Sequence, residues 1–360
     1  MLDQLQQLGV IKYPGSSVEP GVPYQDIPAY RIPGARNNTR LRANRVAELV
    51  NIKDKHILDL GCNVGTMSRR FWELGARVTG VDYDPASIAV AQNLNRGPLY
   101  LVQEITLEFI QQLPQYDIIV WTSQFMWLAK QHGMDYALDC LWEIGRHCDT
   151  LVFETAARDD GSAPLTISQE EVMGLLCRNT IFRRIINTGQ WNDLWTPRDV
   201  FVCSNPLMHY DGFFSSVDTR HTRGQVVKKF KDTAYARELK ARSSMFLGEM
   251  SERGCVPRVL AEDDLSLTMS WEGPYASHIT GRNLERIVFA LYDKRITHRD
   301  IRPDNLLFNG SRVILIDFAF AVRPGELAQT SHDLGKPYRC PTGFDDDYSI
   351  RKVQQELLAK

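Results

Sequence analysis

A turn between a strand and a helix, followed by an acid at the end of the next strand, could hold an adenosyl ligand. The turn reads Asp59-Leu-Gly-Cys-Asn-Val-Gly65, and its two glycines let the backbone come close to a ligand where a Cβ would collide. The helix N-terminus behind them offers free amide donors. Asp82 stands seventeen residues beyond Gly65, where a carboxylate can accept both ribose hydroxyls. NAD, which prefers G-x-G-x-x-G, is an alternative ligand, and a Rossmann-like domain without a nucleotide is another alternative.

A second group of polar residues lies near the carboxyl end, in His298-Arg-Asp-Ile-Arg-Pro-Asp-Asn305 and at Asp317. Asp300 can orient an acceptor hydroxyl and take its proton. Asn305 and Asp317 carry oxygen ligands of the kind that Mg²⁺ prefers. We expect His298 to pack within the protein rather than to react.

The spacing D-x-G-x-x-x-G of the first turn resembles motif I of class I S-adenosylmethionine methyltransferases, and the resemblance covers residues 40–205. It implies that motif I surrounds the methionine part of S-adenosylmethionine and that Asp82 takes the ribose. Glu104 would lie by the adenine, and Thr122 and Ser123 would line the floor near the sulfonium. The expected cofactor site comprises Asp59, Gly61, Cys62, Asn63, Gly65, Asp82, Tyr83, Glu104, Thr122 and Ser123.

The second group resembles the catalytic loop and metal motif of protein kinases, with Asp-x4-Asn followed by Asp-Phe in a strand turn. The resemblance implies that Asp300 is catalytic, that Asn305 and Asp317 bind Mg²⁺, and that Arg302 stands beside the phosphoryl group transferred from ATP. Lys228, which follows an apolar residue, matches the lysine that contacts the α- and β-phosphates. Glu238 is the candidate ion-pair partner of Lys228, and Glu249 is the alternative.

The sequence departs from the kinase pattern in two places. No G-x-G-x-x-G precedes Lys228, since only Gly212 and Gly224 are available, and Ala319 replaces the usual glycine after Asp-Phe. We therefore expect an atypical turn to cover the phosphates, and an inactive kinase-like domain is the alternative. The segment after Asp317 is short, so the helices that usually build a peptide platform are not expected. A sugar, a lipid-linked glycan or another small acceptor is favoured.

A methyltransferase followed by a compact kinase resembles the bifunctional (WbdD-like) family that terminates bacterial O-antigen chains, and the string from Ser123 to Gly133 is similar to a segment of that family. The resemblance implies phosphorylation of a terminal sugar and then methylation of that phosphate. An anionic phosphate oxygen needs no general base but needs a basic clamp. The candidate clamps are Arg31, Arg36, Arg40 and Arg42. A neutral hydroxyl would need a base, and His132 is the first candidate.

Two other functions stay open. One is methylation of RNA or a small molecule, with the kinase-like domain serving as a binding module. The other is a kinase whose methyltransferase half senses the cofactor.

The elements that must position these residues alternate as strands and helices between residues 56 and 154, which predicts a doubly wound, mostly parallel sheet. Strands at 182–188 and 198–204 are expected to close the sheet as an antiparallel pair. The rhythm changes near residue 207, with short strands, a helix at 234–246, a strand at 266–271 and a helix at 283–293. We therefore expect an arm at 1–45, a Rossmann-like class I methyltransferase domain at 46–207 and an α+β protein-kinase-like domain at 208–360.

Composition supports a globular protein of two domains. The chain has 360 residues, 43% of them hydrophobic, and a formal net charge of -2, which argues against bulk binding of nucleic acid. No apolar run approaches the length of a spanning helix, and the first residues do not resemble a secretory signal. Seven cysteines without a C-x-x-C pair favour free thiols and a cytoplasmic protein. Peripheral association with the inner membrane and homo-oligomerisation stay open.

Overall fold

The computed structural model describes residues 25–27, 38–158, 165–191, 198–219, 222–276, 281–326 and 334–358. The chain divides into two compact units. The first comprises residues 1–172 and 185–206, and the second comprises residues 173–184 and 207–360. Each unit is described by itself below.

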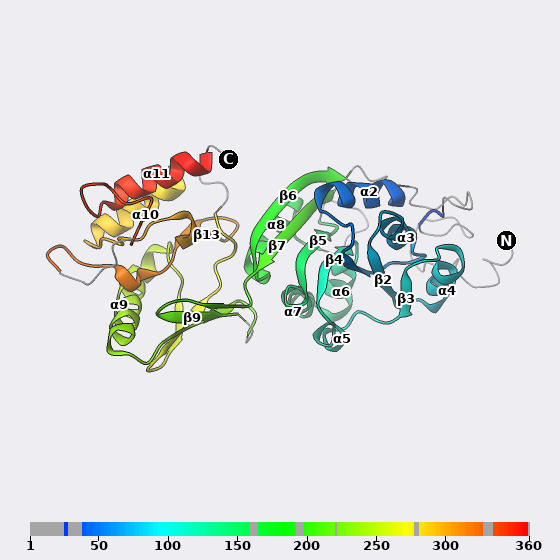
Figure 1. Cartoon of the computed structure of the whole chain (residues 1–360), viewed down its shortest axis with the longest axis horizontal. Helices are drawn as coiled ribbons and strands as arrows, with labels where there is room; N and C mark the ends of the chain where they lie inside the picture. Colours follow the sequence, from blue (N-terminus) through cyan, green and yellow to red (C-terminus); the bar gives the residue numbers. More distant parts are fainter. Residues whose placement is uncertain are drawn as a thin grey trace. The chain divides into compact units, whose positions relative to one another are not determined.

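The first unit is built on a seven-stranded sheet in the order β3-β2-β1-β4-β5-β7-β6 (Figure 1). Its strands are β1 (His56–Leu60), β2 (Arg77–Asp82), β3 (Leu99–Val102), β4 (Tyr116–Thr122), β5 (Cys148–Glu154), β6 (Phe182–Trp191) and β7 (Arg198–Pro206). The neighbours from β3 to β5 are parallel, and β7 runs antiparallel to β5. The carboxyl ends of β1, β2, β4 and β5 therefore meet at one edge of the sheet, together with the start of β7.

Helices cover both faces of this sheet (Figure 1). They are α2 (Thr39–Leu49), α3 (Thr66–Glu73), α4 (Pro85–Leu94), α5 (Leu107–Gln111), α6 (Phe125–His132) and α7 (Met134–Ile144). The next helix, α8 (Gln169–Asn179), begins in the first unit and continues into the second from residue 173. Val46 of α2 and Phe71 of α3 pack with Val120 of β4 and Val152 of β5 in one buried cluster. Because side chains alternate along a strand, Trp121 points to the opposite face, where its ring contacts Phe125 and Phe153 edge-on.

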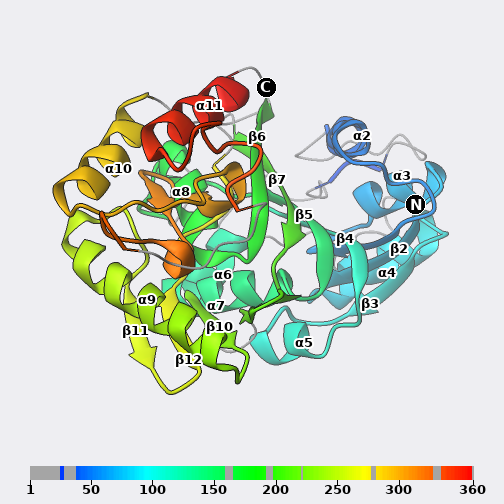
Figure 2. The same cartoon turned by 60° about the vertical axis from the view of Figure 1, so that its left-hand side comes forward.

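The second unit contains a five-stranded antiparallel sheet in the order β11-β12-β10-β9-β8. Its strands are β8 (His209–Asp211), β9 (Ser215–Asp218), β10 (Gln225–Phe230), β11 (Val259–Glu262) and β12 (Ser266–Ser270). Its α-helices in the described residues are α9 (Ala234–Met250), α10 (Gly281–Asp293) and α11 (Asp346–Leu358) (Figure 2). A second, two-stranded sheet pairs β13 (Leu306–Phe308) with β14 (Val313–Leu315). Phe246 of α9, Ile287 of α10 and Val353 of α11 are fully buried in a common core with Leu315 and Phe318.

The two units confirm the expected fold class, a Rossmann-like α/β domain followed by an α+β domain. The strands at 56–60 and 77–82 have the predicted bounds. Two helices, α5 and α6, were not predicted. Each is short, and only Ser123 and Gln124 separate α6 from β4, so no longer loop marks the start of the helix.

Candidate active sites

The turn after β1 brings backbone close to other groups at both of its glycines. Gly61 has φ +80° and Gly65 has φ +78°, a left-handed conformation that costs an L-residue about 1–2 kcal/mol. A Cβ on Gly61 would lie 2.4 Å from Cγ of Gln124, and one on Gly65 would lie 2.6 Å from the hydroxyl of Tyr100. The turn therefore forms a cradle that tolerates no side chain at either position.

Asp82, at the end of β2, links the turn after β1 to the turn after β2 by two hydrogen bonds. One carboxylate oxygen accepts from the backbone N–H of Asn63 at 2.9 Å, and the other accepts from that of Asp84 at 3.0 Å. Burial raises the pKa of Asp82, and these two amides oppose that shift. A buried carboxylate thus lies at the carboxyl edge where a ribose ligand is expected.

Asp59 lies beneath the turn and is only 4% exposed. Its carboxylate accepts from the hydroxyl of Ser68 at 2.6 Å. Burial raises its pKa to about 6, and the charge on Asp82 adds to that increase. Asp59 therefore ties β1 to α3 rather than standing open to solvent.

The other expected adenosyl contacts differ in exposure. The Cys62 side chain packs in a small core with Ile88 and Tyr100, so only its backbone belongs to the turn. Tyr83 is 68% exposed. Glu104 is exposed and lies two residues beyond β3, while the backbone N–H of Gln103 donates to the carbonyl of Asp82 at 2.8 Å. The structure thus brings the loops after β2 and β3 together.

A buried charge cluster occupies the same edge at the ends of β4 and β5. Glu154, which is fully buried, binds Arg198 of β7 at 2.8 Å and also forms an ion pair with Arg42 of α2. Ser123, which has φ +58°, donates to Glu154 at 3.0 Å. Thr122 is half-buried beside it. Sequence reasoning had not identified Glu154 or Arg198, because ion pairs between distant strands have no local signal.

The candidate phosphate clamps lie in different surroundings. Arg42 forms a buried ion pair with Glu154, and Arg40 forms an ion pair with Glu73 of α3 at 2.8 Å. Arg31 and Arg36 lie outside the described residues. Residues 25–27 of the arm lie on the start of α3, because Gln25 Oε1 accepts from the Thr66 N–H at 3.3 Å.

In the second unit, Asn305 holds Asp300 in place by two hydrogen bonds. Asn305 Nδ2 donates to Asp300 Oδ2 at 2.9 Å and to the Asp300 carbonyl at 2.8 Å. The Gly335 N–H donates to the other Asp300 oxygen at 3.1 Å. Burial raises the pKa of Asp300, and the charge of Arg302 opposes the increase. A carboxylate with a raised pKa is suited to accept a proton.

Lys228 of β10 lies against Asp317, with 2.7 Å between Nζ and Oδ1. Burial alone would raise the pKa of Asp317, but the charge and hydrogen bond of Lys228 outweigh it and hold the pKa below its usual value. Asp317 has φ +66°, which places it in the strained turn after β14. The structure thus joins two candidate ligand-binding groups that are 89 residues apart in the chain.

The expected pair between Lys228 and a glutamate is replaced by this contact. Glu238 binds Arg242 one helical turn along α9, at 3.2 Å, with its side chain 52% exposed. The alternative, Glu249, binds Arg323 at 2.6 Å. Both glutamates are therefore engaged by arginines, a competition that the spacing of residues on α9 does not reveal. Arg302 is 42% exposed and lies 3.7 Å from Asp304.

Asp346, the first residue of α11, fixes the backbone of the loop that carries Asp300. Its oxygens accept from the backbone N–H groups of His298 at 2.5 Å and of Arg299 at 3.0 Å. Burial raises the pKa of Asp346 to about 6. The sequence alone assigns Asp346 no role, because its two partners lie 48 and 47 residues earlier in the chain.

His298 is the second support of the loop. It is fully buried, which lowers its pKa to about 4, so the ring is neutral. Nε2 donates to the Ile316 carbonyl at 2.9 Å, and Nδ1 accepts from the Asp300 N–H at 3.3 Å. This arrangement confirms that His298 packs within the protein.

The hairpin of β8 and β9 lies next to β10, on the side of the sheet order where Lys228 pairs with Val217. Its turn closes with the Gly212 N–H donating to the Ser215 carbonyl at 2.8 Å. Phe213 in this turn is 82% exposed. The hairpin is thus the element nearest in topology to a phosphate-covering loop.

Within the described ranges, no three His, Cys, Asp or Glu side chains gather as a metal-binding group. Asn305 and Asp317 supply one amide and one carboxylate, which is donor chemistry suited to Mg²⁺ completed by phosphate and water. The same residues contain no helix that is both long and apolar enough to span a bilayer.

Comparison with known proteins locates the first site. A family model described as a methyltransferase domain matches residues 58–146. A ubiquinone biosynthesis O-methyltransferase of Pseudomonas fluorescens (strain SBW25) is 37% identical over 193 residues, which cover 50% of this chain and 82% of that protein. A protein of the same name from Pseudomonas putida (strain W619) is 39% identical with the same coverage. This chain belongs to the methyltransferase family. The glycine cradle and Asp82 lie inside the matched region and fit S-adenosylmethionine as the methyl donor.

Solved structures are similar over stretches of different length. The bifunctional kinase-methyltransferase WbdD is 19% identical with a TM-score of 0.44, and the similarity covers 89% of this chain and 82% of that one. Magnesium protoporphyrin IX methyltransferase from Synechocystis PCC 6803, with bound SAM, is 18% identical with a TM-score of 0.37 and covers 46% of this chain and 79% of that one.

Proposed function

We propose that this methyltransferase also carries an ATP- and Mg²⁺-dependent kinase site, and that the two sites act in sequence on the end of a bacterial surface polysaccharide. The kinase site would phosphorylate the terminal sugar, and the methyltransferase site would methylate the new phosphate and so terminate the chain. The observation that carries the proposal is the convergence of Lys228 on Asp317, beside a loop in which Asn305 holds Asp300. ATP and S-adenosylmethionine are both cytoplasmic, so we place the reactions there.

In the phosphorylation step, Asp300 would orient the sugar hydroxyl and take its proton as the oxygen bonds to the γ-phosphorus. The bond between that phosphorus and the bridging oxygen breaks, and ADP leaves. Lys228 would hold the α- and β-phosphates, Asn305 and Asp317 would hold Mg²⁺, and Arg302 would lie beside the transferred group. The turn at Gly212 and Phe213 would cover the phosphates in place of a glycine-rich loop.

In the methylation step, an anionic phosphate oxygen would displace the sulfonium, so that an oxygen–carbon bond forms and a neutral thioether leaves. No proton moves, and the chain's task is to align the two reactants. Asp82 would position the ribose, and the cradle at Gly61 and Gly65 would position the methionine part. Arg31 and Arg36 would clamp the phosphate.

Isotope transfer tests the sequence of reactions. The full chain would be incubated with labelled S-adenosylmethionine and a panel of mannose oligosaccharides, with and without ATP. We expect methyl incorporation only with ATP, and incorporation without ATP would refute the sequential scheme. Asp300→Asn and Asp317→Asn should each abolish phosphate transfer yet leave binding of S-adenosylmethionine unchanged by calorimetry. Phosphate transfer that persists in both variants would refute the kinase assignment.

A second candidate is favoured by the names of the curated relatives, which are ubiquinone biosynthesis O-methyltransferases. On this alternative, the chain would methylate a hydroxyl of a small molecule, and the kinase-like unit would serve as a binding module. A neutral hydroxyl needs a base, so His132→Gln should lower the activity. Methylation of a phenolic acceptor without ATP would support this function over the first.

A further inference from the structure

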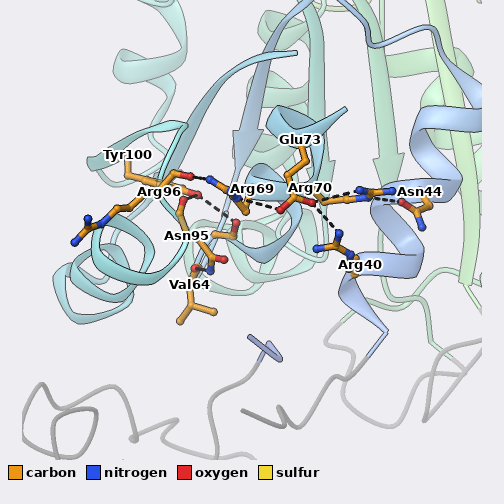
Figure 3. Close-up of polar contacts among 10 residues, drawn as sticks. Arg40, Asn44, Val64, Arg69, Arg70, Glu73, Asn95, Arg96 and Tyr100 are labelled. Atoms are coloured by element: carbon orange, nitrogen blue, oxygen red, sulfur yellow. Dashed lines mark hydrogen bonds and ion pairs between the residues drawn. The ribbon is translucent and has the colours of Figure 1, made fainter. Parts of the chain in front are cut away.

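Three arginines of the first unit bind a single carboxylate on the surface of α2 and α3, and a fourth is joined to one of them through its backbone carbonyl (Figure 3). Glu73 Oε2 lies 2.8 Å from Arg40 and 3.3 Å from Arg70, and its Oε1 lies 3.1 Å from Arg69. Burial alone would raise the pKa of Glu73, but these guanidiniums hold it below its usual value. The fourth, Arg96, is exposed, and its own Nε donates to the Asn93 carbonyl at 3.2 Å. We call Arg40, Arg69, Arg70 and Arg96 the arginine patch.

The arginine patch is held in place by backbone and by ring contacts. Arg69 also donates to the carbonyl of Arg96, which joins α3 to the loop after α4 (Figure 3). That loop is anchored in turn, because Tyr100 donates to the Asn95 carbonyl at 2.9 Å and Asn95 donates to the Val64 carbonyl at 2.7 Å. The patch therefore presents its charges on a preorganised surface rather than on loose side chains.

Large apolar side chains are exposed beside these charges. Trp72, the neighbour of Glu73, is 42% exposed, and the guanidinium of Arg69 lies 4.5 Å from its ring centroid. Its ring covers Gly97, where a Cβ would lie 2.6 Å from it. Leu41, the neighbour of Arg40, is 69% exposed. Tryptophan and arginine side by side are typical of surfaces at the boundary between water and lipid headgroups.

We propose that the arginine patch, with Trp72 and Leu41, docks this protein onto a bilayer that contains anionic phospholipid. The guanidiniums would bind headgroup phosphates, a geometry that suits arginine better than lysine, while the two apolar side chains enter the headgroup region. A bilayer is favoured over nucleic acid because the whole chain has a net charge of -2, whereas the positive charge here is confined to a small surface with exposed apolar side chains. The docking does not depend on which acceptor either active site uses.

Co-sedimentation of the full chain with vesicles tests the proposal. One set of vesicles contains phosphatidylcholine alone, and the other contains equal parts of phosphatidylcholine and phosphatidylglycerol. We expect binding only to the second set, and we expect salt to weaken it. Each basic residue near an anionic surface contributes about a fivefold increase in partitioning, so Arg69→Gln with Arg96→Gln should weaken binding by an order of magnitude or more. The double lysine variant keeps the charge but loses the bidentate geometry, so its binding should lie between that of the wild type and that of the double glutamine variant.

Matched controls separate docking from folding. Lys130 lies 5.3 Å over the ring of Trp127, which is 47% exposed, so Lys130→Gln removes a similar cation from a similar ring outside the patch and should change nothing. Arg96→Gln alone alters one exposed side chain and should weaken binding about fivefold with an unchanged melting temperature. Equal binding of wild type and Arg69→Gln/Arg96→Gln would overturn the proposal. So would retention of single-stranded RNA by a protein that ignores both sets of vesicles.

Discussion

Replacing Asp346 should release the loop that carries Asp300. The carboxylate accepts two backbone N–H groups, from His298 at 2.5 Å and from Arg299 at 3.0 Å. Arg299 has φ +73°, a conformation that must be held by its surroundings. Since burial raises the pKa of Asp346 only to about 6, the group is ionised at neutral pH and both hydrogen bonds are charge-assisted.

The size of the effect follows from those two bonds. A hydrogen bond to a charged group contributes about 1.5–3 kcal/mol, so Asp346→Ala removes about 3–6 kcal/mol of loop stabilisation. If the loop must be ordered for phosphate transfer, the rate should fall by about a hundredfold or more. Asp346→Asn keeps one acceptor and should lose about half of that free energy.

Two measurements check this expectation. Transfer of labelled phosphate from ATP reports activity, and hydrogen exchange at the amides of His298 and Arg299 reports loop order whether or not the chain is an active kinase. Asp347→Asn is the matched control, because Asp347 adjoins Asp346 but lies in an exposed pair with Arg351 at 2.5 Å. If the Asp346 variants exchange and react like Asp347→Asn, the loop is held by other groups and our reasoning fails.

Three further predictions concern the first unit. Gly65→Ala should weaken binding of S-adenosylmethionine at least tenfold by calorimetry, because its Cβ would lie 2.6 Å from the Tyr100 hydroxyl, whereas Gly248→Ala, on the helix α9 with open space around it, should bind normally. The native state holds the proton of Asp59 more tightly than the unfolded chain, since burial raises the pKa to about 6. The protonated Asp59 side chain therefore adds to the free energy of unfolding below about pH 4. This addition, about 3 kcal/mol, is lost as the pH rises through about 6. Asp59→Asn should remove that loss in urea titrations, and an unchanged pH profile would contradict it. Glu154→Gln takes the carboxylate from between two buried arginines and should cost about 3–5 kcal/mol of unfolding free energy, so a variant as stable as wild type would show that the cluster is compensated elsewhere.

The sequence predicted the first sheet well because its signals are local. The strands at 56–60 and 77–82 are apolar runs bounded by turns, and the glycines at 61 and 65 need left-handed backbone that few other residues adopt. Helix α4 begins as its residues predict, with Asp84 accepting from the N–H groups of Ala86 and Ser87 ahead of a proline at the first turn.

The contacts between distant residues could not be predicted in this way. Arg42 binds Glu154, which is 112 residues away in the sequence, and no local sequence pattern near either residue predicts this ion pair. Glu238 is the expected partner of Lys228 because it lies on the next helix. In the structure, Arg242, one turn along the same helix, forms the ion pair with Glu238. Local attraction between residues four apart thus competes with the long-range pair that a family pattern suggests.

The division of the chain affects how its parts can be separated. Residues 173–184 belong to the second unit although residues on both sides of them belong to the first. They are bonded there, with Trp271 Nε1 donating to the Cys177 carbonyl at 3.1 Å and the Tyr275 N–H donating to the Arg183 carbonyl at 2.8 Å. A fragment that begins at residue 207 would therefore lack residues 173–184, which belong to its unit. The fragment that ends at residue 206 would carry those residues without their partners, so that buried side chains such as Leu176 and Cys177 would be exposed. A fusion protein that exchanges one unit at a single junction would have the same fault, so we expect the two units to stay together when such genes recombine.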